Sequence, residues 1–184
     1  MAELLLSAFS DEYAEALEKQ CEALARFGIK YMEVRRADGK NVSEFTENEA
    51  KRIRKTLDAF GIGVSAVGSP LGKTLPSEAS AEQTERVFET AEILGAKYVR
   101  VFSFYLPEGA APERCRGEVL AGMEKIVVAG ERHGILPCHE NEAKIYGESP
   151  QRCLELLQYF GGRLGCVFDM GNFVLDGYDA WDAY

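Results

Sequence analysis

Phe27-Gly28-Ile29-Lys30 decides the fold of this chain, because a helix-like segment ends there and the short, largely apolar run Tyr31–Arg35 begins. A glycine just past a helix end takes the left-handed C-cap conformation that other residues adopt only at a cost. The same junction recurs at intervals of 28 to 39 residues, at positions 60–63, 94–97, 133–135 and 161–164. Helix followed by strand, repeated in this way, predicts βα units and a parallel sheet.

Six strands are expected, each short and apolar nearly throughout, as parallel strands covered on both faces are. The expected strands are Leu4–Ala8, Tyr31–Arg35, Gly63–Val67, Tyr98–Ser103, Ile135–Glu140 and Leu164–Asp169. Pro137 inside the fifth removes a ladder donor, which is unusual away from a sheet edge.

Amphipathic helices are expected between the strands. The first places apolar residues on one stripe at helical spacing: Tyr13, Leu17, Cys21, Leu24 and Phe27. Thr46 with Glu49 predicts a capping box at the start of the second helix, and Ser149-Pro150 predicts the start of the fifth.

One helix per strand leaves two architectures, an open doubly wound sheet or a (β/α)8 barrel. The doubly wound fold often has a glycine-rich first loop, whereas Phe9-Ser10-Asp11-Glu12 has no glycine. We therefore expect an α/β fold of the (β/α)8 TIM-barrel type, a single partial barrel over residues 1–184. Residues 180–184 are too few for a stable isolated helix. The chain is thus expected to be the first three quarters of a barrel, without strands seven and eight.

Composition excludes several classes of function. The net charge of −9 argues against a nucleic-acid binder, which needs clustered Lys and Arg. No run is long enough for a signal-peptide core or a membrane span. Five cysteines with no CxxC pair predict free thiols in a reducing compartment. A cytoplasmic protein is the expectation, and the sequence leaves a homo-oligomer open.

Glu140 and Asp169 close the fifth and sixth expected strands. Ligands of parallel α/β folds bind at the carboxyl ends of strands, where these carboxylates would converge. Two carboxylates can hold a hard divalent cation through oxygen. The alternative is that one caps the following helix and the other pairs with a Lys or Arg.

Around these residues the sequence resembles the xylose-isomerase-like sugar phosphate isomerase/epimerase superfamily. The similar segments are His139-Glu140-Asn141-Glu142, Ile145-Tyr146-Gly147-Glu148, Phe168-Asp169-Met170-Gly171-Asn172-Phe173, Gly68–Lys73 and Arg100–Tyr105. These motifs are specific for the fold and the metal site, and poorly specific for the substrate.

The resemblance implies a divalent metal, with Mn, Mg, Co and Zn not distinguishable. It would be held by Glu140, by Asp169, and by a His and a Glu on the seventh and eighth strands. Glu140 would also be the acid/base that moves a proton next to a carbonyl. Asn172 lies where relatives place a polar side chain that contacts the substrate.

Other residues are candidates for the same site, each with an ordinary structural alternative. Glu142 would replace Glu140 as a ligand if the strand register differed by two. Glu33 resembles an interior acid of the family, or else it pairs with Arg35 or Arg100. Lys73 and Arg100 are candidates for substrate binding, although a solvated loop lysine is the commoner case. His139 is expected to face the helices, and two histidines are too few for the DNA-repair endonucleases that share this fold.

The sequence therefore predicts a metal-dependent isomerase or epimerase acting on a sugar or sugar phosphate. A lyase of the same fold, similar to an inosose dehydratase, shares the first proton abstraction and is the alternative enzyme. The alternative from another class is a non-catalytic partial barrel that binds carbohydrate or a partner chain through its open edges.

Overall fold

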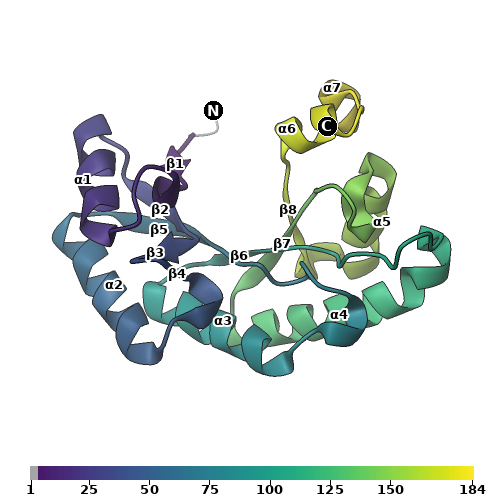
Figure 1. The fold of residues 1–184 in the computed structure, drawn as a ribbon, viewed down its shortest axis with the longest axis horizontal. Helices are drawn as coiled ribbons and strands as arrows, with labels where there is room; N and C mark the ends of the chain where they lie inside the picture. Colours follow the sequence, from purple (N-terminus) through teal and green to yellow (C-terminus); the bar gives the residue numbers. More distant parts are fainter. Residues whose placement is uncertain (1–3) are drawn as a thin grey trace. The chain divides into compact units, whose positions relative to one another are not determined.

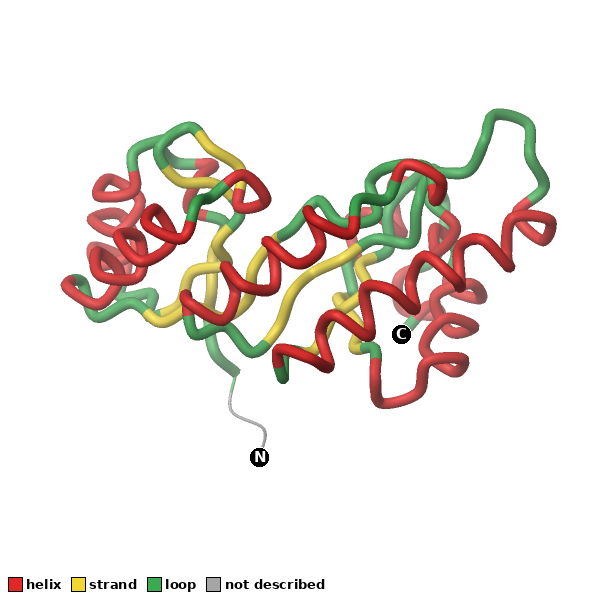
Figure 2. Tube along the Cα trace, turned by 90° about the horizontal axis from the view of Figure 1, so that it is seen from below, coloured by secondary structure: helices red, strands yellow, loops and turns green. Residues whose placement is uncertain are grey.

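A computed structural model describes residues 4–184. The chain divides into two compact units (Figure 1). The first contains the residues up to Ser69 together with Glu85–Val99, and the second contains Pro70–Thr84 and Arg100–Tyr184. Helices and strands alternate along the trace in both units (Figure 2), which is the pattern that the glycine junctions predict.

The main sheet has six strands: β1 (Ser7–Ala8), β2 (Tyr31–Val34), β5 (Gly63–Gly68), β6 (Tyr98–Val101), β7 (Leu136–Glu140) and β8 (Gly165–Val167). Their hydrogen-bonded order follows the chain, β1-β2-β5-β6-β7-β8. The pairs β1–β2, β2–β5 and β7–β8 are parallel. A doubly wound sheet would reverse its strand order at a switch point. The unreversed order confirms the partial TIM-barrel fold.

Seven α-helices are described: α1 (Leu17–Phe27), α2 (Glu47–Ala59), α3 (Ala81–Leu94), α4 (Pro112–His133), α5 (Pro150–Phe160), α6 (Met170–Leu175) and α7 (Ala180–Ala183). The short 3-10 turns are η1 (Ser10–Glu12), η2 (Val42–Glu44), η3 (Pro76–Glu78), η4 (Tyr146–Glu148) and η5 (Gly161–Arg163). Left-handed caps at Gly28 and Gly134 confirm the predicted helix ends. The capping box of Thr46 and Glu49 and the N-cap Ser149 are also as predicted.

The first helix begins four residues later than its apolar stripe suggests. Tyr13 lies before α1 and is 67% exposed, and Phe27 at its end is 70% exposed, so neither joins the core. The reason is a cap from a distant residue: Asp38 Oδ1 accepts the N–H of Leu17 at 2.9 Å, which satisfies a donor at the start of α1.

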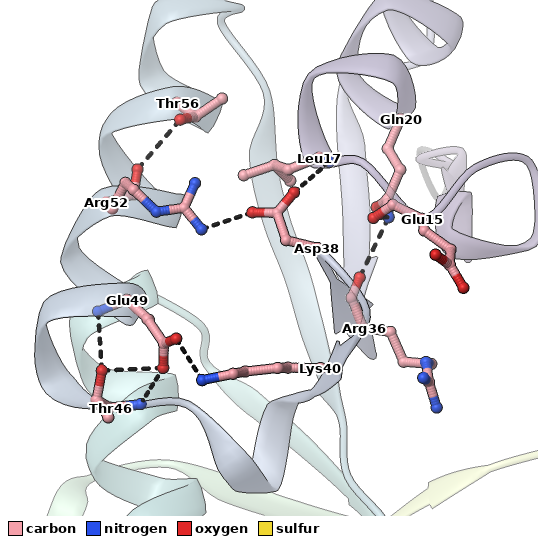
Figure 3. A network of polar contacts seen from close by, with 10 residues as sticks. All are labelled: Glu15, Leu17, Gln20, Arg36, Asp38, Lys40, Thr46, Glu49, Arg52 and Thr56. Atoms are coloured by element: carbon pink, nitrogen blue, oxygen red, sulfur yellow. Dashed lines mark hydrogen bonds and ion pairs between the residues drawn. The ribbon is translucent and has the colours of Figure 1, made fainter.

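Asp38 belongs to a hairpin that the sequence analysis did not anticipate, β3 (Arg36–Ala37) paired antiparallel with β4 (Lys40–Asn41). Asp38 and Gly39 both have positive φ, 51° and 80°, as a two-residue type I′ turn requires. Figure 3 shows the turn tied to its surroundings: Asp38 contacts Arg52 on α2, and Lys40 contacts Glu49.

Five of the six strands are shorter than predicted, β2 and β7 by one residue each and β1, β6 and β8 by more. Residues 4–6 precede β1 and are exposed. β6 ends at Val101 because the Phe102 N–H turns to the Leu71 carbonyl, at 2.7 Å. β8 ends at Val167, so Asp169 does not close a strand but is the N-cap of α6.

Pro137 does lie within β7, and the ladder to β8 begins at the next residue, Cys138 opposite Gly165. The missing donor therefore precedes the first position that pairs with β8.

Four of the five cysteines are buried, only Cys166 is exposed, and all five are free thiols. Of the helices formed by residues 4–184, none combines the length and the apolar character that crossing a bilayer requires.

Candidate active site at the ends of β6, β7 and β8

Residues 71–74, after β5, are hydrogen-bonded to residues 102–105, after β6, and both segments lie in the second unit. Besides the bond between Leu71 and Phe102, the Tyr105 N–H donates to the Thr74 carbonyl at 2.9 Å. Gly72 between these contacts has φ +86°, and a Cβ there would lie 1.9 Å from the Phe102 carbonyl oxygen. Only glycine fits this approach, which fixes the backbone that carries Lys73.

Two ion pairs lie beside the ring of Phe102. Arg100 Nε is 2.9 Å from Glu140 Oε2, and each of these side chains is only 9% exposed. Lys73 Nζ is 2.6 Å from Glu142 Oε2 in a more accessible position. Both cations also approach the Phe102 ring, Lys73 at 4.3 Å and Arg100 at 5.2 Å from its centroid, within the range of cation–π attraction. The structure thus brings together four of the residues that the sequence singled out.

Asp169 lies beyond β8 and is joined to Asn141 and Asn172. Its Oδ1 accepts the Asn172 N–H at 2.9 Å as the N-cap of α6. The Asn141 side chain binds both main-chain groups of Asp169, and Asn172 Nδ2 donates to the Asn141 carbonyl. The ends of β7 and β8 are therefore held together by side-chain amides.

Acidic side chains gather further along the same loops. The pKa of Asp176 is raised, first by burial and then by the nearby carboxylates of Glu148 and Glu142. A negative field of this kind favours a bound cation over a bound anion.

His139 lies on the side of α5, as its position in the strand predicts. Its Nε2 is 3.0 Å from Ser103 Oγ, which also accepts the Gly147 N–H at 2.7 Å. The Gly147 carbonyl in turn accepts the Cys153 thiol. Complete burial lowers the pKa of His139 to about 4, so the imidazole is neutral at physiological pH. It is part of a buried structural network.

Glu33 lies in β2, which belongs to the first unit. Its Oε1 is close to Gly68 at the end of β5, 3.1 Å from where a Cβ would stand. Arg35, one partner considered for it, binds Asp11 and Glu12 instead, at 2.8 and 3.2 Å.

A profile of the xylose isomerase-like TIM barrel family matches residues 21–184. The chain belongs to this family. No curated protein matches the chain.

The chain is similar in fold to several solved structures, including the following three. The IOLI protein with a bound zinc atom has 15% identity and a TM-score of 0.77 over 97% of this chain and 66% of that one. The probable 3-DHS dehydratase AsbF from Bacillus anthracis has 15% identity and a TM-score of 0.77, covering 99% and 68%. D-psicose 3-epimerase in the presence of D-fructose has 15% identity and a TM-score of 0.73, covering 98% and 68%. The chain spans about two thirds of the length of these structures.

The donor atoms of this family member suit a hard divalent cation only in part. Glu140 at the end of β7 and Asp169 at the N-cap of α6 supply carboxylate oxygens, and oxygen is the ligand that such cations prefer. Within residues 4–184, however, no three His, Cys, Asp or Glu side chains lie together in a group that could hold a metal.

Two polar residues of this region were given no role from the sequence. Asn141 lies in the motif His139-Glu140-Asn141-Glu142. It could have been found because a polar side chain here directly follows Glu140, the last residue of β7 that pairs with β8. Ser103, fully buried after β6, gives no comparable signal, because its partners His139 and Gly147 come from far along the chain.

Proposed function

We propose that the protein is a metal-dependent isomerase or epimerase that acts on a sugar or sugar phosphate. The observation that carries the proposal is the buried Glu140 carboxylate at the carboxyl end of β7, which is paired with Arg100. The neighbouring strand, β8, leads to Asp169. Similarity to an epimerase and to a zinc-binding protein supports it.

Glu140 and Asp169 would hold the divalent ion, together with ligands outside the described set. Bound there, such an ion polarises the carbonyl and hydroxyl oxygens of a sugar. Mn, Mg, Co and Zn all fit oxygen donors of this type.

Glu140 would transfer the proton. Its carboxylate takes the proton from the carbon beside the carbonyl, and returning it to the neighbouring carbon gives the isomer. Epimerisation would need a second proton donor on the opposite face of the enediolate. Arg100, paired with Glu140 at 2.9 Å, would orient the carboxylate for both steps. Lys73, Arg100 and Asn172 are the residues proposed to contact the substrate.

A lyase reaction is the second candidate, favoured by the similarity to a dehydratase. It begins with the same proton abstraction and differs in the next step, in which a hydroxyl group leaves as water. A non-catalytic carbohydrate-binding protein is the remaining alternative.

Proton abstraction is tested by incubating the protein with Mn²⁺ and D-fructose in D₂O and following deuterium incorporation beside the carbonyl by NMR. We expect incorporation to fall by about 10²–10⁴-fold in Glu140→Gln. Glu118→Gln, the same change at an exposed site on α4, should behave as the parent protein. Circular dichroism checks that the fold is retained.

Wild-type incorporation in a folded Glu140→Gln variant would refute the catalytic role. Loss in Glu142→Gln instead would identify Glu142 as the acting carboxylate. Loss of water from the sugar would favour the lyase.

A further inference from the structure

The ladder between β7 and β8 stops before it reaches Asp169. Its last paired positions are Glu140 opposite Val167, so Asp169 lies two residues beyond. The backbone of Asp169 is nevertheless fully bonded to the β7 side. Asn141 Oδ1 accepts the Asp169 N–H at 2.9 Å, and Asn141 Nδ2 donates to the Asp169 carbonyl at 2.9 Å.

The Asn141 side chain acts here as an additional peptide group. A carboxamide has one acceptor and one donor in a plane, like the main-chain amide that it replaces. Aspartate lacks the donor, and serine is too short to present both groups. Asn141 is 2% exposed, so each of its bonds forms away from water, where an unmade bond is costly.

Asn172 closes the same set of bonds from the other side. Its Nδ2 donates to the Asn141 carbonyl at 2.7 Å, and its N–H donates to Asp169 Oδ1 at 2.9 Å. Both the main chain and one carboxylate oxygen of Asp169 are therefore fixed relative to the residue that follows Glu140. Four hydrogen bonds among three residues serve this single purpose.

We propose that Asn141 is a positioning residue, which holds Asp169 in register with Glu140 so that the two carboxylates can share a divalent cation. The inference rests on the function proposed above. Groups that form hydrogen bonds to metal ligands and orient them contribute to metal affinity although they do not contact the ion. A merely structural asparagine would contribute to stability alone.

Mn²⁺ binding to the purified protein, measured by the relaxation of water protons, separates these roles. We expect Asn141→Ser to weaken Mn²⁺ binding about 10-fold or more, the range found for such supporting groups. Asn48→Ser, at an exposed position of α2, is the matched control and should bind as the parent does. The comparison is made below the melting temperature of every variant.

Amide hydrogen exchange of the segment around Asp169 is the second measurement. We expect this amide to exchange faster in Asn141→Ser, because its acceptor is removed. If Asn141→Ser does not fold, Asn141→Asp takes its place in the exchange measurement. Aspartate keeps the acceptor but repels the Asp169 carbonyl, so faster exchange is again expected.

Failure of the inference and failure of the proposed function give different results. Mn²⁺ binding that is lost in Glu140→Gln but unchanged in Asn141→Ser would overturn the role of Asn141 alone. A parent protein that binds no Mn²⁺ would overturn the metal site itself. Wild-type exchange at Asp169 in the folded Asn141 variant would also overturn the inference.

Discussion

Each unit contains several arginine–carboxylate pairs, and two of them, one from each unit, differ strongly in burial. In the first unit, Arg52 and Asp38 are 50% and 34% exposed. In the second, Arg100 and Glu140 are each 9% exposed. Two charges removed from water lose more solvation than an exposed pair does, and their attraction often fails to offset the loss.

The network of the first unit has a local structural explanation. Asp38 caps α1 and closes the hairpin turn, while Thr46 and Glu49 form the start of α2 (Figure 3). Although burial acts to raise the pKa of Asp38, hydrogen bonds from the Leu17 N–H and from Arg52 hold it below its usual value. Two acidic residues of this network, Asp38 and Glu49, each complete a helix start.

The pair of Arg100 and Glu140 lies at the end of β7 and is the more buried of the two. A costly burial of charge is where function is expected to override stability. The comparison therefore favours the second unit as the place of the chemistry, and it can be broken or sharpened as follows.

The largest effect is expected from breaking the buried pair. Arg100→Met should lower the free energy of unfolding by about 3–5 kcal/mol, because Glu140 is left as an uncompensated buried charge. Arg52→Met should cost at most about 1 kcal/mol, as exposed pairs do. Urea denaturation monitored by circular dichroism measures both.

Removing both charges sharpens this test. Arg100→Met combined with Glu140→Gln should recover most of the lost stability, because removing both charges of a buried pair destabilises a protein less than removing only one of them. Equal losses in Arg100→Met and Arg52→Met would contradict the proposed contrast between the units.

Acidification should destabilise the protein through His139. Burial lowers its folded pKa to about 4 from 6.5, so between these values the unfolded state binds the extra proton. The contribution of neutral His139 to the free energy of unfolding is therefore fully present above pH 6.5. It is lost as the pH falls towards 4, by up to about 3 kcal/mol.

Urea titrations across this pH range measure the loss. In His139→Gln this part of the slope should disappear, whereas His133→Gln, at the partly exposed end of α4, should keep it. An unchanged slope in the His139 variant would mean that other groups cause the acid sensitivity.

The smallest effect is expected at the helix cap of the first unit. Thr46→Ala removes the acceptor of the Glu49 N–H and should cost about 1 kcal/mol. The matched Thr56→Ala, which removes only a bond to the Arg52 carbonyl within α2, should cost less. Thermal unfolding compares the two, and a larger loss at Thr56 would refute the role of the cap.

Features that depend on neighbouring residues could be predicted from the sequence. A glycine at a helix end, a capping box and an apolar strand each state their conformation within a few positions, as Gly28, Thr46 and β7 show. The family resemblance likewise rests on short motifs around Glu140 and Asp169.

Features that depend on distant partners could not be predicted. The start of α1 is set by Asp38, 21 residues further along, and the end of β6 by the loop that carries Leu71. Asp169 could be recognised as a candidate ligand, but its cap and the amide of Asn141 that holds it follow only from the packing of β7 against β8.

The close contact of Gly72 with the Phe102 carbonyl also restricts how this site can diversify. Loops at the carboxyl ends of barrel strands are where enzymes of this fold vary most freely. Randomising residues 71–74 and selecting for folded protein should therefore return glycine alone at 72, while position 73 accepts many residues. Variation in this loop is thus expected in its side chains, Lys73 among them, while the path of its backbone stays the same.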